Sequence, residues 1–290
     1  MMECLDLFVR YASLTGPNRK RAMHTDFSAL RTSLQIERDD AAQAGRQAKR
    51  LIQVTVPAKE LSVAAIESDG ILLSGNRQVF MEGEQCTIIT TTERMYTGTL
   101  KTCCSGLGVR LDELVSTVED IADLGIQVGD WVEVNPHVHV TQSRFIKARN
   151  LRAISSFALL ICALEMLREY GRALAKGTVF CIHFEDDPAG RHECWGIQGG
   201  TYCPEDFEES LRIDTLAITG ENGLDEYSVA LQGEGLERIA KEKNIPYKAI
   251  SGMGEGNILA TAFQVDGLSE RGHETGIEAA IRLLSLYLSE

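Results

Sequence analysis

The segment that decides the fold is Thr178-Val-Phe-Cys-Ile-His-Phe-Glu-Asp-Asp-Pro188, an apolar run followed by three acidic residues. The run predicts a buried strand over Val179–Phe184, with carboxylates directly at its end. A long helix is expected before it, from about Ala153 to Leu174, apolar at first and then charged. Helices alternating with short apolar strands indicate an α/β domain whose mostly parallel or mixed sheet is covered by helices on both faces.

The same alternation continues on both sides of this segment. Further expected elements are a helix at Cys4–Leu14, a surface helix at Asp39–Arg50 in the polar stretch from Asn18, strands at Leu51–Val56 and Thr215–Ile218, a helix within Leu231–Lys243 and a closing helix at Gly276–Leu288.

A different pattern interrupts the domain between about Ser68 and Val134. Short β-rich pieces separated by Gly, Asp, Asn and Glu turns predict a small antiparallel barrel or sandwich, with a helical piece at Leu111–Leu124. The β-rich pieces are Gly70–Leu73, Gln78–Met81, Cys86–Thr91 and Met95–Leu100. We therefore expect an α/β domain from residues 1–66 and 135–290, and an inserted β-barrel domain from residues 67–134.

Charge and composition exclude some partners. The net charge of −13 disfavours nucleic acid and anionic membranes as partners, since both repel an acidic protein. The sequence contains no apolar stretch of the roughly 20 residues needed to span a bilayer. Of the eight cysteines, Cys162 and Cys181 lie in apolar runs, and we expect reduced thiols in the cytoplasm.

Four polar segments lie where strands end or helices begin, and ligands bind at the carboxyl ends of strands in open α/β sheets. Glu185 and Asp186 suit a general base beside a metal ligand, or form a solvated acidic turn. Asn150 opens the buried helix and suits an N-cap. Glu221 follows a strand as a ligand or a turn residue. His273 is a candidate ligand or acid/base, although Glu274 and Thr275 after it also suit a helix start.

Two other features suggest weaker sites. His137 and His139 alternate in an apolar segment expected to be a strand and share a face, but no third zinc ligand lies near, so we interpret them as surface or interface residues. The loop Gly252-Met-Gly-Glu-Gly-Asn257 is glycine-rich like a phosphate-binding loop but lacks the lysine of a P-loop.

From about Ala64 to the C-terminus, the order of these segments resembles the glutamyl (tetrahedral) aminopeptidase family of co-catalytic metallopeptidases. The resemblance also rests on Leu124-Gly-Ile-Gln-Val-Gly-Asp130, which is similar to the turn that leaves the family's barrel, and on Ile245-Pro-Tyr247. It implies a zinc-peptidase-like α/β domain interrupted by a small β-barrel, and a homo-oligomer.

The resemblance also assigns roles. It implies Glu185 as general base, Asp186 and His273 as metal ligands, Asn150 at the position of the metal-bridging aspartate, and Arg152 as the arginine of the same motif. Glu221 matches the family's next acid only after a shift of one residue.

The departures concern the metal ligands. The place of the family's first histidine and aspartate reads Val56-Pro-Ala-Lys59-Glu60. Asn150 is neutral, and two close divalent ions need a bridging anion to offset their repulsion.

Three hypotheses follow. The first is a catalytically degenerate scaffold or ligand-binding relative. The second is a divergent aminopeptidase or amide hydrolase that acts on a peptide or small amide through one zinc, cobalt or manganese ion, with Glu185 as base and Asp186, Glu221 and His273 as ligands. The third is metal-free binding of an acidic or amide ligand by Lys59, Arg152 and Arg271.

Overall fold

The computed structural model describes residues 4–14, 16–34, 50–56, 61–67, 70–75, 82–103, 106–175, 177–184, 193–195, 207–254, 256–267 and 269–290. The chain divides into two compact units. The first comprises Met1–Ser13, Arg21–Pro57 and His137–Glu290, and the second comprises Leu14–Lys20 and Ala58–Pro136. We expected the insertion to begin at residue 67, whereas strand β2 (Leu61–Glu67), before that boundary, belongs to the barrel.

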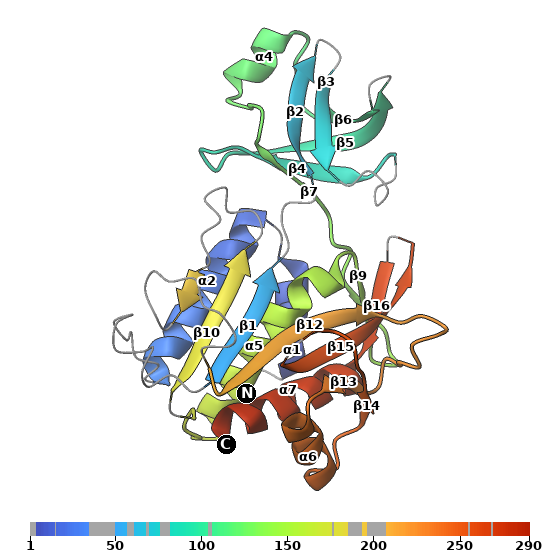
Figure 1. Cartoon of the computed structure of the whole chain (residues 1–290). Coiled ribbons are helices and arrows are strands. Elements are labelled where there is room, and N and C mark those ends of the chain that lie inside the picture. Colours follow the sequence, from blue (N-terminus) through green and yellow to red (C-terminus); the bar gives the residue numbers. More distant parts are fainter. Residues whose placement is uncertain are drawn as a thin grey trace. The chain divides into compact units, whose positions relative to one another are not determined.

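The first unit is built on a mixed sheet, which has ten strands within the described residues (Figure 1). Its order is β11-β10-β1-β12-β15-β16-β9-β8, and β13 and β14 join it through β15. The neighbours β10, β1, β12 and β15 are parallel. Strand β11 is antiparallel to β10, β13 is antiparallel to β15 but parallel to β14, and β16 is antiparallel to β15 and β9. The strands are β1 (Arg50–Val56), β8 (His139–Val140), β9 (Phe145–Ala148), β10 (Thr178–Phe184), β11 (Glu193–Trp195), β12 (Glu209–Ala217), β13 (Val229–Gln232), β14 (Tyr247–Ala249), β15 (Asn257–Asp266) and β16 (Ser269–His273).

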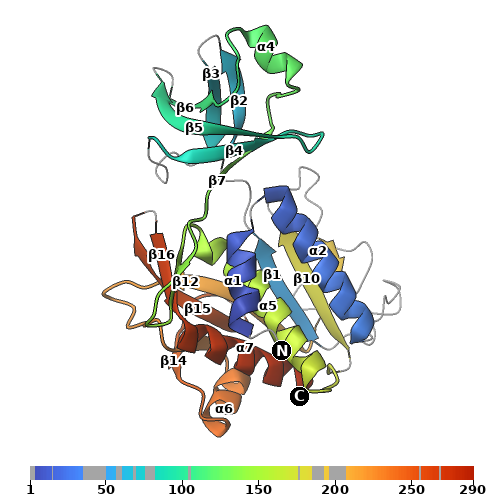
Figure 2. The same cartoon turned by 180° about the vertical axis from the view of Figure 1, so that it is seen from behind.

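Helices cover one face of this sheet. They are α1 (Cys4–Ser13), α2 (Gly16–Ser33), α5 (Leu151–Glu169), α6 (Glu234–Glu242) and α7 (Glu274–Ser289). Helices α1 and α2 lie behind the strands in Figure 1 and in front of them in Figure 2. Helix α5 packs on β1, β12, α1 and α7, and α6 contacts α7. The mixed α/β fold is therefore confirmed, but the helices expected on the second face are not found among the described residues.

The long helix α5 is the centre of the core. It is buried from Ile154 to Leu164 without interruption, because this stretch is apolar apart from Ser155 and Ser156. Aromatic pairs join it and the sheet to the N-terminal helices. The rings of Tyr11 and Phe157 lie 6.1 Å apart, and those of Phe27 and Phe180 lie 5.8 Å apart. Within the described residues, no helix is long and apolar enough to cross a membrane.

The second unit contains the expected barrel. Within the described residues, six strands close in the order β2-β3-β6-β5-β4-β7. Besides β2, they are β3 (Gly70–Gly75), β4 (Gln85–Ile89), β5 (Met95–Cys103), β6 (Gly106–Leu111) and β7 (Trp131–Val134). Alternate residues of these strands, such as Ile71, Leu73, Ile88 and Leu100, fill the interior.

Some sequence expectations need correction. The helix predicted at Leu111–Leu124 is the shorter α4 (Val118–Asp123), because Thr117 and Asp120 form a capping box that starts it late. The polar stretch after Asn18 holds most of the helix α2, which we had not predicted. Strands β15 and β16 were also not predicted. The predicted strand at Gln78–Met81 and the predicted helix at Asp39–Arg50 lie outside the described residues, except that Arg50 begins β1.

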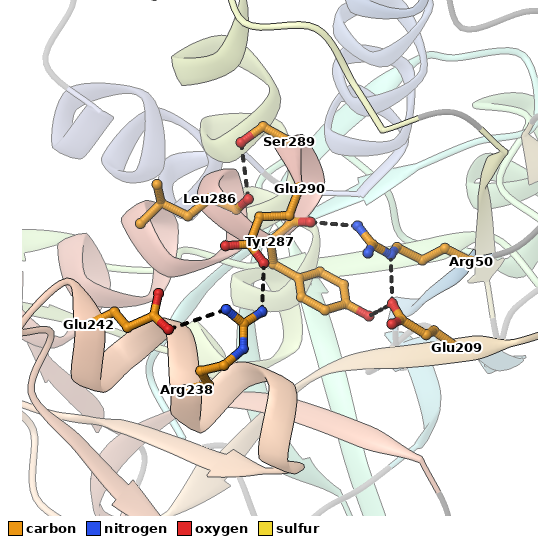
Figure 3. A network of polar contacts seen from close by, with 8 residues as sticks. All are labelled: Arg50, Glu209, Arg238, Glu242, Leu286, Tyr287, Ser289 and Glu290. Carbon is orange, nitrogen blue, oxygen red and sulfur yellow. Dashed lines mark hydrogen bonds and ion pairs between the residues drawn. The ribbon is translucent and has the colours of Figure 1, made fainter.

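The end of α7 is fixed to the sheet by a polar network (Figure 3). Arg50 donates from Nη1 to the Tyr287 carbonyl at 2.6 Å and from Nε to Glu209 Oε2 at 2.9 Å. The Arg50 guanidinium also lies 4.3 Å from the centre of the Tyr287 ring. Arg50 begins β1 and Glu209 begins β12, so the network holds the last turn of α7 against the starts of two central strands.

Candidate functional site

The candidate site is the edge where the parallel strands β10, β1, β12 and β15 end. Two of the segments expected there lie outside the described residues: Lys59, after β1, and the pair Glu185 and Asp186, after β10. The described part of the edge consists of the start of α5, the turn after β12, and β16.

Asn150 occupies the N-cap position of α5, as expected, but does not act as an ordinary cap. Its backbone is left-handed, with φ 56° and ψ 32°, and within the described residues its side chain makes no capping hydrogen bond. Asparagine tolerates this conformation better than most residues do. The helix start therefore needs an acceptor from elsewhere.

Glu270 of β16 provides that acceptor. Its Oε2 accepts the backbone N–H of Arg152 at 2.7 Å, and its Oε1 accepts Nε of the Arg152 side chain, also at 2.7 Å. Glu270 is only 8% exposed. A carboxylate at the amino end of a helix is favoured by the helix dipole, so this contact stabilises α5 as well as pairing two charges.

His273 lies at the other end of β16, where the chain turns into α7. Its Nδ1 accepts the N–H of Thr275 at 3.1 Å, so the side chain caps α7. Its Nε2 donates to the Ser143 carbonyl, 3.0 Å away, which specifies the tautomer with the hydrogen on Nε2. Both ring nitrogens therefore have partners within the protein. The ring also packs against Phe145 and Tyr227, with centroids 4.8 and 4.6 Å away.

The strand register separates His273 from Glu270. Glu270 pairs with Ala148 and Val265, at the carboxyl ends of β9 and β15, whereas His273 pairs with Phe145 at the start of β9. Three residues along a strand span about 10 Å. Glu270 thus lies nearer to the candidate edge than His273 does. We had not predicted a role for it from the sequence, although alternation in a short strand puts Glu270 and Gly272 on one face.

Arg271 also has a carboxylate partner. Its Nε donates to Glu226 Oε1 at 2.6 Å, and the guanidinium lies 4.8 Å from the centre of the Phe145 ring. The hydrogen bond to Glu226 raises the pKa of Arg271 above its ordinary value. The positive charges of Arg271 and Arg152 are both compensated inside the protein.

Glu221 lies in the exposed turn after β12. The turn is organised by its neighbour Asn222, whose Oδ1 accepts the N–H of Thr219 and whose Nδ2 donates to the Ala217 carbonyl. The hydrogen bonds that hold this turn among the described residues do not use the Glu221 carboxylate.

The described residues do not fit a metal ion. Among them, with 57–60 and 185–192 excluded, no group of three or more His, Cys, Asp and Glu side chains is arranged to hold one. The donors support the same conclusion, because Asn150 is neutral and both nitrogens of His273 are hydrogen-bonded.

The two weaker features do not add a site. His137 has a positive φ of 48° and lies before the two-residue strand β8, which begins with His139, so the two histidines do not alternate in one strand. In the glycine-rich loop, Gln232 donates to the carbonyls of Gly254 and Gly256, and Arg212 donates to that of Met253. These two side chains tie the loop to β12 and β13.

Comparison with known proteins identifies the family. A family model described as M42 glutamyl aminopeptidase matches residues 107–268, more than half of the chain. The chain belongs to the M42 glutamyl aminopeptidase family. This confirms the resemblance noted in the sequence, and the matched residues end just before β16 and so exclude His273.

Individual proteins resemble this chain in sequence or in fold. YhfE of Bacillus subtilis (strain 168) is 32% identical to this chain over 213 residues, and its aminopeptidase activity is assigned by inference. The match spans 66% of this M42 family member but only 60% of YhfE. Aminopeptidase APDkam598 from Desulfurococcus kamchatkensis shares the fold with a TM-score of 0.70 at 15% identity, over 99% of this chain and 95% of its own. The Pyrococcus horikoshii TET1 peptidase gives a TM-score of 0.61 at 14% identity, over 84% of both chains.

Proposed function

We propose that this M42 family member is catalytically degenerate and uses the aminopeptidase fold as a scaffold or binding module, without metal-dependent hydrolysis. The observation that carries the proposal is the state of His273, the match to the family's last metal ligand. Its two ring nitrogens bond to Thr275 and Ser143, so the residue acts as a helix cap.

The position of the bridging ligand supports the same proposal. Two divalent ions held close together repel each other, and a carboxylate between them offsets that repulsion. The neutral Asn150 cannot supply this charge, and its left-handed backbone belongs to a helix start. In the sequence, Lys59 adds a positive charge where the family has an acidic ligand.

The pairing of the two arginines bears on what the scaffold binds. Under the third hypothesis, Lys59, Arg152 and Arg271 hold an acidic or amide ligand. Because Arg152 pairs with Glu270 and Arg271 with Glu226, their charges are already compensated. We therefore favour a scaffold role over an anion pocket at this edge.

Assembly and compartment belong to the same proposal. We propose a homo-oligomer in the cytoplasm. The Pyrococcus horikoshii TET1 peptidase, which shares the fold, can assemble into a tetrahedron or a large octahedral shell. Among the described residues, Cys86, Cys103, Cys162 and Cys181 form no disulfide bond, which is compatible with a reducing compartment. Light scattering coupled to size exclusion tests the assembly, since a mass of 31.9 kDa would mean a monomer.

A hydrolysis assay tests the main proposal. The protein is incubated with zinc, cobalt or manganese and a panel of aminoacyl amides, beside the variants Glu185→Gln and Asp186→Asn. We expect no release above the buffer rate from any of them. Hydrolysis by the wild type that is lost in Glu185→Gln, with folding unchanged, would instead establish a single-metal hydrolase that uses Glu185, Asp186, Glu221 and His273.

A further inference from the structure

The described part of the candidate edge is held together by an ion pair in place of a metal. We propose that Glu270 and Arg152 form a fixed internal clamp between β16 and α5, which maintains this edge without metal and keeps divalent cations out. The inference rests on the proposed function, and it names the residues that replace the metal structurally.

The clamp has the geometry of a strong interaction. Both oxygens of Glu270 are used, one by the Arg152 backbone and one by its guanidinium, each at 2.7 Å. The Glu270 side chain is 10% exposed and that of Arg152 is 37% exposed. A charge-assisted hydrogen bond in such a protected position is stronger than an exposed surface pair, because solvent screens it less.

The clamp also replaces a missing helix cap. The first N–H groups of any helix lack partners within the helix. In α5, the Asn150 side chain makes no cap bond, and the Asn150 carbonyl accepts the N–H of Ala153 at 3.1 Å. Glu270 satisfies the N–H of Arg152, and its charge opposes the positive end of the helix dipole. The start of the central helix thus depends on a residue more than a hundred positions away.

The remaining contacts fix the clamp in position. The Arg152 carbonyl accepts a hydrogen bond from Thr215 of β12 at 3.4 Å. On the opposite face of β16, Arg271 bonds to Glu226 and His273 bonds to Ser143. Strand β16 is therefore tied to three parts of the unit, and Glu270 has little freedom to turn away from Arg152.

The charges explain why a metal is excluded. A divalent cation that approached Glu270 would have to displace the guanidinium of Arg152 from the same carboxylate. It would also meet the positive end of α5, which repels cations. Asn150 contributes no negative charge to compensate for either cost.

Thermal unfolding of three variants in the full chain tests the clamp. Glu270→Gln keeps the shape and one acceptor but loses the charge, and we expect its Tm to fall by about 4–8 °C. Arg152→Met removes only the guanidinium, so a smaller fall is expected. The matched control is Glu242→Gln, which breaks the exposed Arg238–Glu242 pair and should lower the Tm by less than about 2 °C. An equal Tm for Glu270→Gln and the control would overturn the clamp.

Metal titration tests the second half of the inference. The Tm of the wild type should change by less than about 1 °C with a chelator or with excess zinc, since a ligand that binds only the folded state raises the Tm. Asn150→Asp restores a carboxylate at the start of α5 and, with the clamp intact, should still bind no zinc by mass spectrometry. Zinc bound by Asn150→Asp at one equivalent would overturn the exclusion of metal by the clamp.

The outcomes separate this inference from the proposed function. If Glu270→Gln is as stable as the wild type and no metal binds, the clamp is wrong and the degenerate enzyme stands. If the wild type holds a metal that Asp186→Asn loses, the proposed function is wrong. The claim that the edge is free of metal is then also wrong, and the stability of Glu270→Gln does not change this conclusion.

Discussion

His273 is the residue at which a structural role and a catalytic role predict different results. As a cap, it must present an acceptor to the N–H of Thr275, and asparagine is among the best residues for that task. As a metal ligand, it must present an imidazole nitrogen, which asparagine lacks. The variants His273→Asn and His273→Ala therefore form a discriminating pair.

The magnitude follows from the contacts of the ring. Loss of an N-cap costs about 1 kcal/mol, loss of the bond to the Ser143 carbonyl about 0.5–1 kcal/mol, and loss of the contacts with Phe145 and Tyr227 about 0.5–1.5 kcal/mol. His273→Ala should thus lose about 2–3.5 kcal/mol, which corresponds to a fall in Tm of about 4–14 °C for a unit of this size. His273→Asn keeps the cap and should lose about half as much.

The assay is urea or thermal unfolding followed by circular dichroism, with His139→Ala as control because His139 is exposed. Equal losses in the alanine and asparagine variants would refute the capping role. The refutation would be complete if both variants also lost a metal that the wild type carries.

Two further predictions concern the rest of the fold. Arg50→Met removes the charged donor to the Tyr287 carbonyl and the cation beside the Tyr287 ring (Figure 3), while the side chain keeps about the same length. It should lower the free energy of unfolding, measured by denaturant titration, by about 2–4 kcal/mol. A loss below about 0.5 kcal/mol would contradict the proposed role of Arg50 in anchoring α7. Burial raises the pKa of the Cys86 thiol to about 12. In native protein at mildly alkaline pH, Cys86 should therefore be alkylated far more slowly than the partly exposed Cys103, as measured by mass spectrometry of the labelled peptides. Equal alkylation rates would argue against the closed barrel core.

Much of the framework could be predicted because its segments have strong local patterns. The strand β10, the buried helix α5 and the closing helix α7 are each long apolar runs with clear ends. The barrel followed from short β-rich pieces between turns, and its closure is confirmed. Strand β15 was not predicted, although Ile258–Val265 is mostly apolar.

The chemistry of the site was harder to predict for a physical reason. A histidine before a helix and an asparagine at a helix start have the same local sequence context whether they bind a metal or cap the helix. The difference lies in their partners: Ser143 and Thr275 for His273, and the Glu270 carboxylate that serves α5 in place of the Asn150 side chain. The bonds to Ser143 and from Arg152 to Glu270 join residues so far apart in sequence that they leave no local pattern.

The most direct test of the central claim is the metal content of the purified protein. Full-length protein, prepared without chelator and exposed to zinc, cobalt and manganese in turn, is desalted and analysed by inductively coupled plasma mass spectrometry. The account predicts less than about a tenth of an equivalent of any of these metals per chain, since the ligands needed for tight binding are replaced or engaged elsewhere. One firmly held equivalent that disappears in His273→Ala or Asp186→Asn would contradict it.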